Sequence, residues 1–134
     1  MGTRALVRVF DEGREILCLY KQFDGYPEGL GKNLAEFVSS KQITNGVRGD
    51  GAGTANGMGC LAGQILTHLK DGCVGSVYVY PPGSSDCGEE YEYHVRGPGR
   101  TETLGAADRA TVEAFEVSHG TRLTPIVSVA AVAS

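Results

Sequence analysis

Residues 58–95 read MGCLAGQILTHLKDGCVGSVYVYPPGSSDCGEEYEYHV and show the clearest pattern in the chain. Apolar residues recur at helical spacing in the first third of this stretch: Met58, Leu61, Ala62, Ile65 and Leu69. This spacing predicts an amphipathic helix with one stripe against a core. Gly72 supplies the positive φ that commonly ends a helix. We therefore expect a buried helix from Met58 to Leu69 that stops at Asp71 and Gly72.

Two strand-like segments follow this helix. SVYVY, at 76–80, is rich in β-branched and aromatic residues, and the PPG at 81–83 ends it. After the polar loop SSDCG, the segment EEYEYHV alternates in polarity, as a strand does when its two sides differ. The alternation places two sets of side chains on opposite sides: Tyr91, Tyr93 and Val95 against Glu90, Glu92 and His94. We expect the helix and these two strands to be neighbours.

The N-terminal third predicts a hairpin and a second helix. The strand at 4–10 and the strand EILCLYKQF at 15–23 are joined by a short turn with Gly13, which predicts antiparallel pairing. In DGYPEGLGKNLAEFV, at 24–38, apolar residues again have helical spacing: Leu30, Leu34, Phe37 and Val38. This helix is expected to end near Ser39 and Ser40.

The remaining segments add a loop, a strand and a tail. Residues 42–57 are glycine-rich and predict a loop, with Asn56 as a cap for the next helix. That loop is either a connector or an anion cradle at a helix N-terminus. RATVEAFEV, at 109–117, predicts a strand, and the apolar tail from 124 fits an edge strand, a partner contact or a frayed end.

Together these elements predict an α+β fold. We expect an antiparallel sheet of four to five strands with two helices on one face, in the order ββααβββ, a variant of the ferredoxin-like sandwich. At 134 residues with 41% hydrophobic content, the chain is expected to form one domain, 1–134.

The composition also restricts the class of protein. The net charge of −4 counts against a large nucleic-acid surface. We find no apolar run near the roughly 18 residues of a membrane span and no apolar core of a signal peptide, so a cytoplasmic protein without a membrane partner is expected. Four cysteines lack CxxC spacing, which predicts reduced thiols instead of a zinc site or a disulfide framework: Cys18, Cys60, Cys73 and Cys87.

A first candidate site lies at the end of the first strand. Asp11 and Glu12 stand in a turn, with Arg8 and Arg14 close in sequence. A carboxylate at a strand end is held rigidly and remains accessible, which suits a metal ligand or a general base. The alternative is ordinary turn chemistry, because Asp commonly hydrogen-bonds its own backbone in turns.

A second candidate site is the loop before the last clear strand. Asp86, Glu89 and Glu90 are crowded beside Cys87, and crowded acids favour a shared cation, although a solvated loop has the same composition. His94 is the acid–base candidate of this region. Ser39 and Ser40 are nucleophile candidates only if the fold brings a base to them. Four tyrosines could stack a base or could be half-buried sheet residues: Tyr78, Tyr80, Tyr91 and Tyr93.

Two resemblances arise from these residues. The pieces FDGYPEGLG, ANGMGCLAGQ and YPPGSSDCGEEYEYHV resemble an uncharacterised family of short bacterial and phage proteins, over most of the chain. Separately, LVRVFDE resembles the first strand of the small ferredoxin-like CRISPR-associated nucleases of spacer acquisition. That second resemblance implies a nuclease in which Asp11 is the aspartate at the end of strand one.

Two functions follow as hypotheses. The first is a small nuclease or phosphodiesterase acting on DNA or RNA as a homodimer, with Asp11 as a base or as a ligand of Mg or Mn. Arg8, Arg14 and the tyrosines would then bind nucleic acid. The second is a non-catalytic accessory module of phage-related origin that binds a nucleotide or a protein. The acidic net charge favours the second, and the strand resemblance favours the first.

Overall fold

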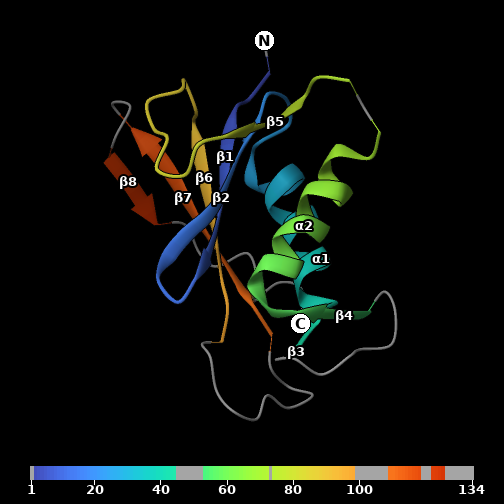
Figure 1. Cartoon of the computed structure of the whole chain (residues 1–134). Helices are drawn as coiled ribbons and strands as arrows, with labels where there is room; N and C mark the ends of the chain where they lie inside the picture. Colours follow the sequence, from blue (N-terminus) through green and yellow to red (C-terminus); the bar gives the residue numbers. More distant parts are fainter. Residues whose placement is uncertain (1, 45–52, 73, 99–108, 119–121, 126–134) are drawn as a thin grey trace.

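Six strands form one sheet whose centre is the N-terminal strand (Figure 1). The computed structural model describes residues 2–44, 53–72, 74–98, 109–118 and 122–125. The strands of the sheet are β1 (Ala5–Asp11), β2 (Arg14–Lys21), β5 (Val77–Tyr80), β6 (Tyr91–Arg96), β7 (Thr111–Ser118) and β8 (Arg122–Pro125). They lie in the order β5-β2-β1-β6-β7-β8. Only the β1–β6 pair in this sheet is parallel. The predicted α+β class is therefore confirmed.

The predicted N-terminal hairpin is present. Asp11 pairs with Arg14 across a two-residue turn, in which Glu12 has φ 52° and Gly13 has φ 80°. Two consecutive left-handed residues are the signature of the tight hairpin turn that matches the twist of antiparallel strands. Glycine at the second position makes this turn accessible at little steric cost.

Both helices cover the same face of the sheet (Figure 1). A π-helical turn, η1 (Pro27–Gly31), leads into α1 (Lys32–Ser39), and α2 spans Gly57–Lys70. The predicted apolar stripe of α2 is confirmed, because Met58, Leu61, Ala62 and Ile65 are buried and Leu69 packs on their cluster. Asp71 and Gly72 follow with positive φ of 41° and 75°, as predicted for the helix end.

The core lies between the helices and alternate residues of the sheet. Its sheet side chains point to the helix face: Ala5, Val7, Val9, Leu19, Val77, Tyr93, Val95, Val112 and Ala114. Tyr93 is the largest fully buried side chain. Its hydroxyl donates to the carbonyl of Gly25 at 2.6 Å, and a Cβ on Gly31 would lie 3.0 Å from its ring. The segment 25–31 therefore packs directly on this tyrosine.

The segment 42–57 is not entirely loop, contrary to our prediction. Two short strands, β3 (Gln42–Thr44) and β4 (Thr54–Asn56), pair in parallel as a separate ribbon. Ile43 and Ala55 join the core from this ribbon, so burial of single apolar residues stabilises segments too short to show a period. Asn56 is at the N-cap position of α2, but its side chain makes no capping hydrogen bond.

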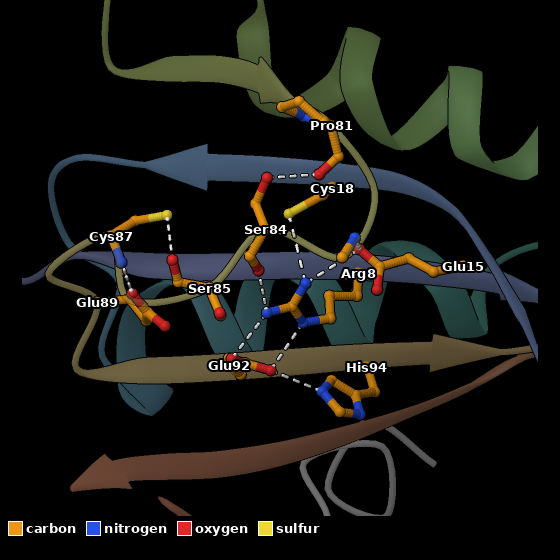
Figure 2. Close-up of polar contacts among 11 residues, drawn as sticks. Arg8, Glu15, Cys18, Pro81, Ser84, Ser85, Cys87, Glu89, Glu92 and His94 are labelled. Atoms are coloured by element: carbon orange, nitrogen blue, oxygen red, sulfur yellow. Dashed lines mark hydrogen bonds and ion pairs between the residues drawn. The ribbon is translucent and has the colours of Figure 1, made fainter. Parts of the chain in front are cut away.

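The expected strand arrangement needs correction. The sheet has six strands instead of four or five, and β5 and β6 are not neighbours. β5 pairs with β2 at one edge, while β6 lies between β1 and β7. The connection 81–90 crosses over β2 and β1, and polar contacts with those strands hold it there (Figure 2). The alternation of polarity along a strand does not reveal which strands lie beside it, so this crossing could not be predicted from the sequence.

Several expectations fall outside the described residues. These concern Cys73, the part of the glycine-rich segment at 45–52, and the tail from 126. Within the described chain, Cys18, Cys60 and Cys87 are free thiols. None of the described helices has the length and apolar character needed to cross a membrane.

Candidate functional site

A groove lies on the exposed side of the helix layer, between α1, α2 and the segment before α1. Its volume is about 1180 Å³, slightly above the roughly 300–1,000 Å³ typical of small-molecule sites. The sheet end and the segment before α1 contribute Lys21, Asp24, Tyr26, Gly29 and Leu30. The α1 side contributes Asn33, Phe37 and Lys41. The α2 side contributes Cys60, Gly63, Gln64, Thr67, His68, Leu69 and Asp71.

An aromatic pair lines this groove. The rings of Phe37 and His68 stack with their centroids 4.2 Å apart and their planes 13° apart. His68 Nε2 lies 2.7 Å from Asn33 Oδ1, and because an amide oxygen only accepts, Nε2 donates in this contact. The Nζ of Lys41 lies 4.8 Å from the Phe37 centroid, a cation–π distance. The stack and the hydrogen bond together fix the orientation of the exposed imidazole.

Gly63 leaves the α2 wall of the groove open. A Cβ on Gly63 would meet no other atom within 4 Å, and glycine inside a helix is roughly 0.5–1 kcal/mol less stable than alanine. No contact with the described chain therefore requires glycine here. The neighbouring Gln64 donates Nε2 to the Thr54 carbonyl at 3.0 Å. Its Oε1 is buried and has no hydrogen-bond partner in the described part of the chain.

The opposite face of the sheet carries a buried ion network centred on Arg8 (Figure 2). Nε and Nη2 of Arg8 donate to the two carboxylate oxygens of Glu92 at 2.8 and 3.0 Å, and Nη1 donates to Glu15 Oε2 at 3.0 Å. Nη2 also donates to the Ser84 carbonyl at 2.5 Å, and Nη1 to Cys18 Sγ at 3.7 Å. The hydrogen bond to Glu92 raises the pKa of Arg8 against the effect of burial. These contacts use all the guanidinium N–H donors, so none is left for a phosphate.

Glu92 connects this network to His94. Burial raises the pKa of the Glu92 carboxyl, but hydrogen bonds from His94 and Arg8 outweigh burial and lower that pKa to about 2. His94 Nε2 lies 2.9 Å from Glu92 Oε1. The imidazole lies between the rings of Phe10 and Phe115, at centroid distances of 5.3 and 4.5 Å. A carboxylate that orients an imidazole is an arrangement used in acid–base catalysis, but His94 is only 8% exposed.

The loop 81–90 is fixed to this face by the same charged groups (Figure 2). The Gly83 amide donates to Glu15 Oε2 at 2.9 Å, in addition to the contact of Arg8 with Ser84. Within the loop, the Cys87 amide donates to Glu89 Oε1 at 2.7 Å. Burial raises the pKa of the Cys87 thiol, which disfavours its reactive thiolate form. The network therefore anchors the crossing between β5 and β6.

The predicted strand-end site is at the β1–β2 turn. Asp11 is half-buried, while Glu12 and Arg14 are exposed. Asp86, on the loop 81–90, is exposed with φ 55°. No three described His, Cys, Asp or Glu side chains come together in a way that could hold a metal ion.

Two of the predicted metal ligands are distant from Asp11. The parallel strands β1 and β6 pair from Ala5 and Tyr91 at one end to Phe10 and Arg96 at the other. Glu89 and Glu90 come just before the first of these ends, and Asp11 comes just after the second. At about 3.3 Å per residue, the seven to eight residues between them give a separation along the strands of about 25 Å. One ion cannot contact both ends.

The predicted serines are also separated from the predicted base. Ser39 Oγ donates to the Glu36 carbonyl at 3.1 Å, and Ser40 Oγ donates to the Phe37 carbonyl at 2.6 Å. Ser39 is the last residue of α1 and Ser40 is its C-cap, so both hydroxyls are on the helix side of the sheet. His94 is on the other side, so the fold brings no His94 base to either hydroxyl.

The four tyrosines do not form one stacking surface. Tyr93 is fully buried, so its ring has no free face for a base, and Tyr91 is half-buried on the same side of β6. Tyr78 and Tyr80 are on β5, which β2 and β1 separate from β6. Tyr80 stacks on Tyr20, with centroids 5.1 Å apart and planes 6° apart. The four rings therefore do not lie on adjacent strands, and Tyr80 and Tyr91 are the half-buried sheet residues of the alternative reading.

Sequence reasoning missed the groove residues. Asn33 and Phe37 are on α1, Lys41 follows that helix, and His68 is on α2. The sequence put Phe37 in an apolar stripe and His68 on the exposed face of its helix, but it did not bring the two together. A usable signal was the position of His68 on the face of α2 that the apolar stripe leaves exposed. Comparisons with protein-family models, with curated proteins and with solved structures gave no match.

Proposed function

We propose that this protein is a non-catalytic binding module whose ligand occupies the groove between α1 and α2. The groove itself supports this proposal, because it is concave, is large enough for a small organic ligand, and has polar groups along an open wall. Gly63 lines the groove, and its missing side chain leaves space there for a ligand.

Binding fits the groove better than catalysis. Its imidazole, on His68, is committed to Asn33 and stacked on Phe37. The thiol of Cys60 is two helical turns from His68, a rise of roughly 12 Å, so the two do not form a nucleophile–base pair. The lining side chains are suited to orienting a ligand by stacking and hydrogen bonding.

The experiment uses a matched pair of substitutions on α2. Gly63→Leu fills the groove, whereas Gly59→Leu adds the same side chain on the same helix at a position that does not line it. A Cβ at either position meets no atom within 4 Å, so both variants are expected to fold. Thermal shift assays with a set of metabolites should give ligands that raise the Tm of wild type and Gly59→Leu but not of Gly63→Leu. A set without any such ligand would contradict the proposal.

A nuclease remains the second candidate, supported by the Glu92–His94 hydrogen bond. In this proposal His94 is the base, Asp11 positions a divalent cation, and a homodimer related to the ferredoxin-like nucleases acts on DNA or RNA. Asp11→Asn should then keep the melting curve and lose cleavage of both substrates. Wild-type protein that cuts neither substrate with Mg or Mn between pH 5 and 9 would exclude this candidate.

A further inference from the structure

The exposed imidazole of His68 offers a stacking surface for a planar ligand. Phe37 covers one face of this ring at 4.2 Å and nearly parallel, yet His68 remains exposed. The solvent-exposed surface of the imidazole is therefore its other face and its edge. A heteroaromatic ring placed there would extend the existing stack by one layer, a contact available to every nucleobase.

A hydrogen-bonding group lies at the edge of that stack. Asn33 Oδ1 accepts from His68 Nε2 at 2.7 Å, so its amide nitrogen is beside the ring and carries two N–H donors. Asn33 is exposed. Side-chain amides of this kind recognise the edge of a base, as Asn and Gln do with adenine. A base stacked on His68 would meet both an aromatic face and an amide.

Charged groups stand within the same groove. Lys21 is at the end of β2, and its Nζ donates to the neutral hydroxyl of Ser76 at 3.3 Å. Asp24 and Asp71 also line the groove. A lysine suits a phosphate and an aspartate suits the hydroxyls of a ribose. The groove also has open space at Gly63, because no atom lies within 4 Å of a Cβ built there.

We propose that the groove binds a free nucleotide, with its base stacked on His68 beside Asn33, its ribose at an aspartate and its phosphate at Lys21. This inference depends on the proposed binding function and specifies its ligand. A mononucleotide fits better than a nucleic-acid strand, because the chain has a net charge of −4 and a strand would need a basic surface along its path.

Isothermal titration calorimetry with AMP, GMP, CMP and UMP tests the proposal. Adenosine and inorganic phosphate separate recognition of the base from recognition of the phosphate. His68→Ala should weaken nucleotide binding roughly 5- to 150-fold, the loss expected for one base–aromatic stack. His68→Phe should retain most of the affinity because it keeps a ring. Lys21→Gln should weaken the binding of AMP but not the binding of adenosine.

The groove variants provide the control. Gly63→Leu should abolish nucleotide binding, and Gly59→Leu should bind as wild type does. Nucleotide binding that survives Gly63→Leu, or equal binding to wild type and His68→Ala, would overturn the proposal. So would adenosine binding as tightly as AMP. If no nucleotide binds but another class of metabolite binds to wild type and not to Gly63→Leu, this inference is wrong and the proposed function stands. If no compound binds, both are wrong.

Discussion

The buried carboxylate of Glu92 should make the stability of this protein strongly dependent on acid pH. Glu92 is 4% exposed and accepts hydrogen bonds from Arg8 and His94. Its pKa falls from the usual 4.5 to about 2 in the folded protein. A group whose pKa is lower when folded stabilises the protein above the unfolded pKa and loses that contribution as pH falls through the folded value. The affected window is therefore about pH 5 to pH 2.

The magnitude follows from that difference in pKa. Each pKa unit corresponds to 1.36 kcal/mol, so a fall from 4.5 to about 2 corresponds to roughly 3 kcal/mol of folding free energy at neutral pH. Removing one partner of a buried ion pair costs a similar amount, roughly 3–5 kcal/mol. Both estimates predict that the charge of Glu92 contributes a large part of the folding free energy, which is roughly 5–15 kcal/mol for an ordinary domain.

Glu92→Gln is the variant that tests this reasoning, because it keeps the shape and removes the charge. Urea unfolding at pH 7 should show the variant roughly 3 kcal/mol less stable than wild type. The two stabilities should converge between pH 5 and pH 2, as the wild-type carboxyl becomes neutral. Glu113→Gln is the control, since that carboxylate is 51% exposed in its pair with Arg96 and should have little effect. A difference between Glu92→Gln and wild type that stays constant from pH 7 to pH 2 would refute the argument.

Two further predictions concern the core. Leu61 is fully buried in the stripe of α2, so Leu61→Ala should cost on the order of 2–5 kcal/mol in denaturant unfolding; an unchanged Tm would mean that α2 is packed differently. Tyr93→Phe removes the donor to the Gly25 carbonyl and should cost roughly 1–3 kcal/mol, because it leaves a buried acceptor unsatisfied. Its amide exchange should increase in the segment 25–31, and exchange identical to wild type would contradict the anchoring role of Tyr93.

The sequence by itself determined the local elements. The spacing of Leu61 and Ile65 predicted the buried face of α2, because one face of a helix repeats every three to four residues. Gly72 predicted its end, and Gly13 predicted the β1–β2 turn, because both positions need φ values that glycine adopts easily. Alternation also separated Tyr93 and Val95 from Glu92 and His94 on β6. Such patterns depend only on residues close in the chain.

The tertiary structure alone decided which side chains meet. Arg8 and Glu92 are 84 residues apart in sequence, and they form an ion pair only because β6 pairs with β1 in parallel. The stack of the groove similarly needs α1 beside α2, since Asn33 and His68 are 35 residues apart. The alternation of side chains along a strand shows which face is buried but does not show which strand lies beside it. The order of strands therefore follows from the packing of the whole chain. For this reason the sequence predicted the helix and the hairpin, while the charged network and the groove required the fold.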